Sequence, residues 1–191
     1  MTDSEFYANA TLGFRQWYFS PRTEGNQPPS LEGLVKYGFG RPRYRWNLKG
    51  PNHAECLRLK FNPDSFSEEH GEVPNTGCSC GFYAHGLRDA SNSETTVHMV
   101  GGIVAGWGKL ELHERGFKCG MAKILAVFAP DPPRTHPHYG ELALESWAAL
   151  KSMCTGTDIP MLSPDALRED AEVRRYARER DLILLEEQLV T

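Results

Sequence analysis

The sequence predicts an α+β fold in which a bent, mostly antiparallel sheet precedes one or two C-terminal helices. Val97–Leu112 and Phe117–Phe128 are long apolar runs with β-branched residues, and the polar turn Glu114–Gly116 separates them as in a hairpin. After residue 140 the apolar side chains recur at helical spacing instead. This change of period along the chain separates a sheet from a helical end.

Residues 10–130 carry the strand signals. Leu12–Phe19 and Tyr44–Leu48 are rich in aromatic residues and are typical of strands. Proline and glycine interrupt the front half at short intervals, which favours short strands and loops over long helices. The run Val97–Leu112 contains four glycines, and a glycine within a strand marks a bulge, a bend or a close backbone approach.

The first predicted helix covers residues 140–153. Within it, Leu142, Trp147 and Leu150 recur at the spacing that places them on one helical face. Proline-rich sequence before this segment indicates a stiff connector from the sheet. We therefore expect the helix to pack its apolar face on the sheet.

A second helix is predicted to begin at Ser163. Its hydroxyl suits the N-cap, Pro164 suits the first helical position, and Asp165 lies near the positive end of the helix dipole. The helix is expected to reach at least Arg180, and later leucines keep its spacing as far as Leu189. We thus divide the chain into one α+β domain over residues 1–160 and a C-terminal helical extension over residues 161–191.

The composition is that of a folded domain. The chain has 191 residues, of which 40% are hydrophobic and 24% charged, and this excludes wholesale disorder. A net charge of −4 argues against a polycation built for nucleic acid. No apolar run approaches the roughly 20 residues of a membrane helix. The acidic start Met1–Glu5 is unlike a secretory signal, so we expect a cytoplasmic protein.

Cysteine and histidine form the densest chemical motif. The chain has five cysteines, and an odd number without a signal peptide argues against a disulfide framework. Cys56, His70, Cys78 and Cys80 fall within 25 residues, and four thiolate and imidazole ligands are what a structural Zn²⁺ takes. Glycines beside the Cys-x-Cys pair let the backbone wrap an ion closely. The motif predicts a zinc-knuckle-like site.

The same residues have alternatives. Free cysteines are often buried as small apolar groups, so the thiols could be unligated. His70 is the least secure ligand, and His53 or His113 could replace it. Cys154 follows the apolar face of the first helix and suits packing, whereas Cys119 suits either the core or a position facing His113.

The chain resembles a family of uncharacterised proteins from actinobacteria and their bacteriophages. The resemblance covers residues 12–128 and keeps the order of its pieces, which are Arg15–Trp17, Ala54–Cys56, His70 with Pro74, Cys78–Ala84, Val100–Gly108 and the turn His113–Lys118. The family's Arg-Ala after the aromatic residue is Lys118-Cys119 here, and the tail beyond Pro160 has no counterpart. The resemblance implies that Cys56, His70, Cys78 and Cys80 act together, and it implies no activity.

The end of the hairpin offers a second candidate site. Trp107, His113, Arg115 and Cys119 could line a pocket in which His113 and Glu114 act as acid and base, or His113 activates the Cys119 thiol. The simpler interpretation is a polar turn between two strands, which is favoured because such turns are common.

A basic strip is the third candidate. On a strand, Arg41, Arg43 and Arg45 share one face, so the strip Arg41–Lys49 could neutralise phosphates while its aromatic residues stack on bases. The favoured alternative is an edge strand whose aromatics enter the core and whose arginines are solvated.

The functional interpretation follows from these candidates. No nucleotide-binding, zinc-protease or serine-hydrolase motif is present, which weighs against an enzyme. We expect a non-enzymatic accessory or regulatory module, phage or actinobacterial, that holds a structural zinc and binds another protein or itself through the C-terminal helix. The alternatives are nucleic-acid binding through the basic strip and a small enzyme with a pocket at Trp107 and His113.

Overall fold

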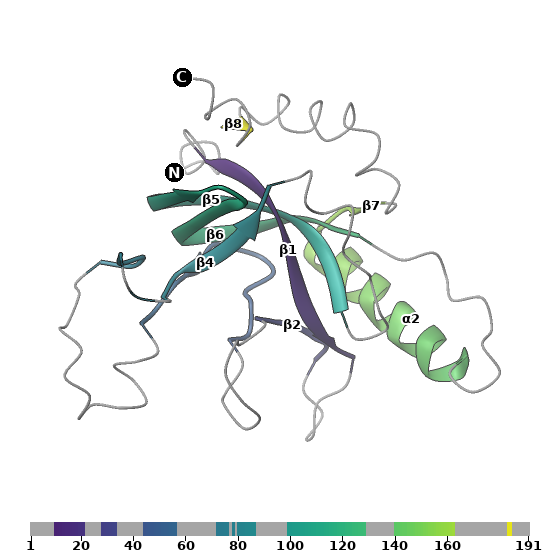
Figure 1. Ribbon diagram of the computed structural model, residues 1–191. Coiled ribbons are helices and arrows are strands. Elements are labelled where there is room, and N and C mark those ends of the chain that lie inside the picture. The colour runs from purple at the N-terminus through teal and green to yellow at the C-terminus, as the bar shows by residue number, and fades with distance from the viewer. Residues whose placement is uncertain are drawn as a thin grey trace.

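One eight-stranded, mostly antiparallel sheet dominates the structure, with a helix beside it (Figure 1). The computed structural model describes residues 10–21, 28–33, 44–56, 72–76, 78, 80–86, 99–128, 140–162 and 183–184. Within these ranges the elements are β1 (Thr11–Ser20), β2 (Ser30–Gly33), β3 (Asn52–His53), β4 (Phe82–His85), β5 (Met99–His113), β6 (Gly116–Phe128), α2 (Gly140–Thr157), β7 (Met161–Leu162) and β8 (Ile183–Leu184). The predicted α+β class is confirmed as a mostly antiparallel sheet with one helix.

The long hairpin predicted from the sequence is β5 and β6. Its strands pair from Gly102 with Val127 to His113 with Gly116, and the turn falls where the polar residues predicted it. The register shifts twice, between Ile103 and Val104 and again between Trp107 and Leu110. A Cβ built on Gly102 would overlap the carbonyl oxygen of Ala126. The glycines therefore mark bulges and close approaches, as expected.

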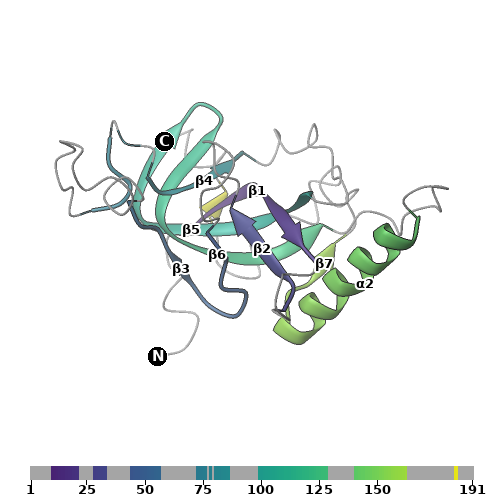
Figure 2. The same cartoon turned by 90° about the horizontal axis from the view of Figure 1, so that it is seen from below.

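Four strands close a circuit of pairings. β1 pairs with β5, β5 with β6, β6 with β4, and β4 returns to β1 through Phe14 opposite His85. β2 and β3 extend the sheet from β1 and β6. The circuit curves the sheet, as the view from below shows (Figure 2). A curved sheet encloses the side chains on its concave face.

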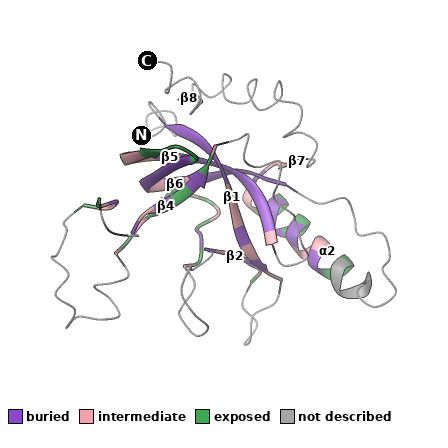
Figure 3. Cartoon of the chain, viewed as in Figure 1, coloured by how far each residue is buried: buried purple, intermediate pink, exposed green. Residues whose placement is uncertain are grey.

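Two clusters of buried side chains form the core. Figure 3 shows buried residues along β1 and on part of α2. The first cluster holds the largest aromatics and joins the sheet to α2; its members include Trp17, Trp46, Phe82, Phe117, Cys119, Leu150, Met153 and Cys154. The second cluster packs on the opposite side of β1 and includes Leu12, Phe14, Ile103, Leu125 and Phe128. The alternation of these residues along β1 follows from the two-residue period of a strand.

The segment Tyr44–Leu48 is not a regular strand. It makes one isolated β-bridge, between Arg45 and Glu32. Backbone hydrogen bonds from the N–H of Trp46 to the carbonyl of Leu31 and from the N–H of Gly33 to the carbonyl of Tyr44 also hold it. The aromatic side chains are nonetheless in the core region, because Trp46 is 3% exposed. The aromatic composition of this segment correctly predicted that Trp46 is buried. The prediction that the segment forms a regular strand was wrong.

The predicted helical extension needs correction at four residues. Met161–Leu162 forms β7, parallel to β6, and Ile183–Leu184 forms β8, parallel to β1. At Ile183–Leu184 the leucine spacing misled, because leucines at such spacing do not distinguish a helix from a short strand. The predicted helix over Ser163–Arg180 lies outside the described residues, as do residues 185–191. Among the described helices, none is long and apolar enough to cross a membrane.

Candidate metal centre

Two loops carry the cysteines, and both are fastened to β6. Ala54, just after β3, donates its N–H to the carbonyl of Gly120 at 2.8 Å, which places Cys56 beside the sheet. The other loop passes so close that a Cβ on Gly120 would overlap the carbonyl oxygen of Val73. Only glycine allows this approach without a shift of the loop. β6 is thus the frame on which the cysteine loops meet.

The Cys78 loop turns sharply before β4 begins. The N–H of Cys78 donates to the carbonyl of Asn75 at 3.1 Å, which closes a turn. Gly81, directly after Cys80, has φ +113°, a left-handed conformation that glycine adopts without strain. The Cys-x-Cys-Gly sequence can therefore point both sulfurs toward the same space, as the motif predicted.

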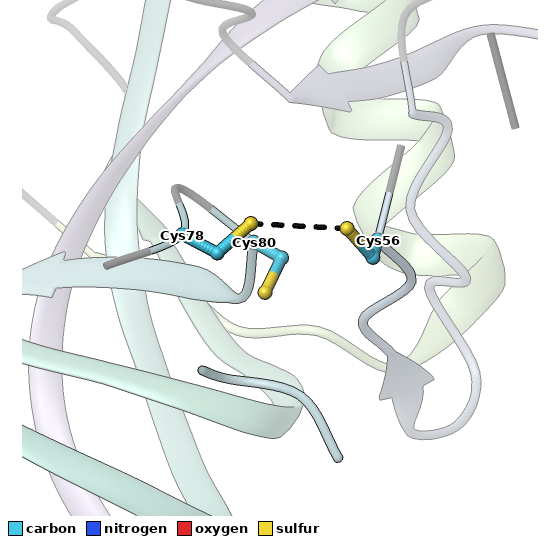
Figure 4. Close-up of side chains that lie close together, drawn as sticks. All are labelled: Cys56, Cys78 and Cys80. Carbon is cyan, nitrogen blue, oxygen red and sulfur yellow. Dashed lines mark hydrogen bonds between the residues drawn. The ribbon is translucent and has the colours of Figure 1, made fainter. Parts of the chain in front are cut away.

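Three thiols meet where these loops approach each other (Figure 4). The sulfurs of Cys56, Cys78 and Cys80 all lie within 4.8 Å of one another, and Cys56 Sγ is 3.8 Å from Cys78 Sγ. Cys80 is buried, whereas the other two are partly exposed. Three converging thiols from separate segments, one pair 22 residues apart, could hold a metal ion.

The electrostatics of the cluster favour a cation. The pKa of the Cys80 thiol is raised to about 11, mainly by burial and in smaller part by the neighbouring Cys78 and Cys56, because like charges repel. Without a cation, Cys80 therefore stays protonated at neutral pH. A bound metal ion would stabilise the thiolates and displace the proton.

Lys118 on β6 ties the Cys78 loop to the hairpin. Its ammonium donates to the carbonyls of Asn75 and Cys78, each at 3.2 Å, and lies 2.5 Å from the carboxylate of Glu111. The hydrogen bond from Lys118 is the main cause that lowers the pKa of Glu111. Lys118 is 3% exposed, so its charge is compensated by groups that belong to the loop and to β5. Lys118 thus positions the loop that carries one candidate metal ligand, Cys78.

Replacing Lys118 with methionine is expected to weaken metal binding about tenfold. Residues that orient a metal ligand without contacting the metal change metal affinity on this scale. Lys109→Met is the matched control, since Lys109 pairs with Glu72 at 3.5 Å and the two side chains are 42% and 78% exposed. Exposed pairs contribute little. Competition with a chromogenic chelator measures both affinities, and equal affinities in the two variants would contradict the role given to Lys118.

None of the described histidines joins the three cysteines. His53 and His113 are exposed and neither joins the cysteine group, whereas His70 lies outside the described residues. Within the described part of the chain the donor set is therefore three thiols. The prediction that His70 completes the site stays a prediction.

The structure does not bring together the four residues of the proposed hairpin pocket. Trp107 packs against the second cluster, whereas Cys119 is fully buried in the first. His113 and Arg115 are exposed at the turn. Because cross-strand partners share a face, the register places His113 and Cys119 on opposite faces. Burial raises the pKa of Cys119 to about 12, the reverse of what a nucleophile needs.

The basic strip is described only in part. Arg41 and Arg43 lie outside the described residues. Arg45 is exposed, and its backbone forms the β-bridge with Glu32. Trp46 is buried against Trp17 at a ring-centroid distance of 5.5 Å, so it is not available to stack on a base. This arrangement matches the edge-strand alternative for the aromatic residues.

Cys154 and Lys118 show what composition does and does not reveal. Cys154 is 1% exposed within the first cluster, in line with the packing role expected for it. Sequence reasoning missed Lys118 and Glu111, because a lysine and a glutamate on adjacent strands resemble ordinary solvated residues. The available signal was a lysine near the start of the apolar run Phe117–Phe128.

Comparisons with protein-family models, with curated proteins and with solved structures find no match to this chain.

Proposed function

We propose that the chain is a non-enzymatic binding module whose loops are held by one structural Zn²⁺, with Cys56, Cys78, Cys80 and His70 as ligands. The observation that carries the proposal is the meeting of three thiols. Zn–S bonds of about 2.3 Å in a tetrahedron separate two sulfurs by about 3.8 Å. The separation of Cys56 Sγ and Cys78 Sγ is 3.8 Å, so a zinc ion fits between them with little rearrangement.

The position of the cluster supports a structural role for the ion. Cys56 and the pair Cys78 and Cys80 lie in two segments outside the strands, so a metal ion that cross-links them would stabilise their arrangement beside the sheet. Thiolate-rich, four-ligand zinc sites leave no position for a substrate. A closed site of this kind orders a surface and does not itself catalyse a reaction.

Metal analysis tests this part of the proposal. Protein purified without chelator is expected to contain about one zinc per chain, and Co²⁺ substituted for zinc is expected to give the intense visible absorption of a four-coordinate thiolate site. Cys154→Ala, which removes a thiol outside the cluster, should keep the full stoichiometry. Protein without bound zinc would overturn the proposal, and a weakly absorbing, higher-coordinate cobalt site would favour an enzyme.

The surface beside the cluster supports a protein partner. Tyr83 follows the Cys-x-Cys-Gly sequence on β4 and is 44% exposed, while Phe82 and Ala84 on either side are buried. Its ring lies 5.9 Å from the ammonium of Lys118, which also holds the Cys78 loop. A rigidly placed, exposed tyrosine is typical of residues that anchor protein interfaces.

Tyr83→Ala is therefore expected to weaken partner binding at least tenfold while leaving zinc content unchanged. Leu144→Ala on α2 is the matched control, because Leu144 is 43% exposed and lies on a different element. Proteins captured from the source cells by wild-type chain are compared between the two variants. A partner retained equally by both would move the binding surface away from β4.

A further inference from the structure

A second group of side chains lies apart from the cysteine cluster and consists only of hydrogen-bond donors. Arg15 Nε, Trp17 Nε1 and Trp46 Nε1 are each enclosed and have no hydrogen-bond partner. Trp17 is 0% and Trp46 3% exposed, and their rings meet edge to face with centroids 5.5 Å apart. Buried donors without acceptors are costly and uncommon in folded proteins, so three in contact require an explanation.

The guanidinium of Arg15 lies among aromatic rings. Its central carbon is 4.9 Å from the ring centre of Trp46 and 5.9 Å from that of Phe82, and Nη1 donates to the carbonyl of Tyr83. No carboxylate in the described part of the chain pairs with it. Burial lowers the pKa of Arg15 only to about 10, so the group is charged at neutral pH. A partly buried cation attracts an anion more strongly than an exposed one does, because less water screens it.

Space the size of a methyl group lies beside two of these residues, Arg15 and Trp46. Gly33 on β2 lies opposite Trp17, and a Cβ built on it would sit 3.7 Å from Arg15 Nη2 and 3.7 Å from Trp46 Nε1. The third neighbour, at 3.7 Å, is the carbonyl oxygen of Tyr44, which already accepts the N–H of Gly33. The absence of a side chain at Gly33 thus leaves room beside a guanidinium and an indole N–H.

We propose that this group is a binding site for an oxyanion, the carboxylate or phosphate of a small-molecule ligand. Such a group is an acceptor only, which matches a site whose unpaired atoms are all donors. The planar fork of arginine suits either oxyanion, and the indole N–H of Trp46 offers a further donor. This inference is independent of the zinc site, which uses other residues.

Indole resonances provide the test in the intact, zinc-loaded chain. The protein has four tryptophans, and their side-chain N–H signals report separately in a ¹⁵N-correlated spectrum. Sodium acetate and sodium phosphate are titrated separately, with sodium chloride at matched ionic strength. We expect a saturable shift of the Trp46 signal, and of Trp17 beside it, with Trp107 and Trp147 unmoved. Saturation by acetate alone identifies a carboxylate site, and saturation by phosphate alone identifies a phosphate site.

Gly33→Ala is the decisive variant. Its methyl group would occupy the space at ordinary contact distances of 3.7 Å, so the fold should be retained while oxyanion affinity falls at least tenfold. Arg15→Lys keeps the charge, loses the fork and should also weaken binding. Identical shifts with chloride, no saturation with either oxyanion, or unchanged affinity in folded Gly33→Ala would overturn the proposal.

Discussion

Cys78→Ser is expected to abolish stoichiometric metal binding and to lower the free energy of unfolding by about 3 kcal/mol or more. Zinc-binding energy is in part folding energy, since the ligands are brought together only in the folded chain. Cys78 is the ligand for which the structure gives the most support, because its sulfur is 3.8 Å from that of Cys56 and its carbonyl accepts from Lys118. Metal analysis and chemical denaturation of the same samples measure the two losses.

Two controls separate the metal from the mutation. Cys154→Ala removes a fully buried thiol from the first cluster, and we expect it to cost about 1 kcal/mol without loss of metal. Wild-type protein in excess chelator should match Cys78→Ser in stability, because both lack the ion. A Cys78→Ser variant as stable as metal-loaded wild type would show that the three thiols are ordinary packing residues.

Gly102→Ala is expected to destabilise the chain by about 3 kcal/mol, at the upper end of the cost of overpacking. Gly102 lies between β1 and β6, opposite Arg15 on one side and Val127 on the other. An added Cβ would overlap the backbone carbonyl of Ala126 and come within 2.9 Å of the Trp17 ring. The overlap is with the backbone, so the hairpin itself must shift. Thermal and denaturant unfolding measure the loss.

Gly156→Ala makes the same chemical change in open space. Gly156 lies near the end of α2, and a Cβ there would meet no atom within 4 Å. Because alanine is the better helix former, this variant should gain up to about 1 kcal/mol. Equal effects of the two substitutions would mean that the close approach at Gly102 does not limit the packing of β1, β5 and β6.

Much of the sheet could be predicted because its signals are local. The β5–β6 hairpin, its polar turn and its strand glycines follow from residues that are neighbours in sequence, and α2 follows from the period of its apolar side chains. The cysteine motif was recognisable for the same reason, since Cys-x-Cys with adjacent glycine sets its own backbone geometry. Local propensity and local spacing suffice where the partners are close along the chain.

Contacts between distant segments were beyond reach of the sequence. The expected strand at Tyr44–Leu48 makes only one bridge, and Ile183–Leu184 pairs with β1 where helical spacing was expected to continue. Whether a segment pairs with a strand far along the chain depends on which edge of the sheet the fold leaves unpaired. The spacing of hydrophobic residues does not indicate which edge that is. Short apolar segments take the conformation of the sheet that receives them.

The class of fold, the hairpin, the first helix and the thiols that are candidates for a metal all follow from local patterns in the sequence. Only the three-dimensional fold shows that Cys56 reaches Cys78, that Lys118 holds the Cys78 loop, and that His113 faces away from Cys119. It also shows that Arg15 lies beside Trp46, and that the missing side chain of Gly33 leaves space next to both. The physical reason is that a site is defined by distances of a few ångströms, and only the closing of the sheet brings residues 15, 33 and 46 that near.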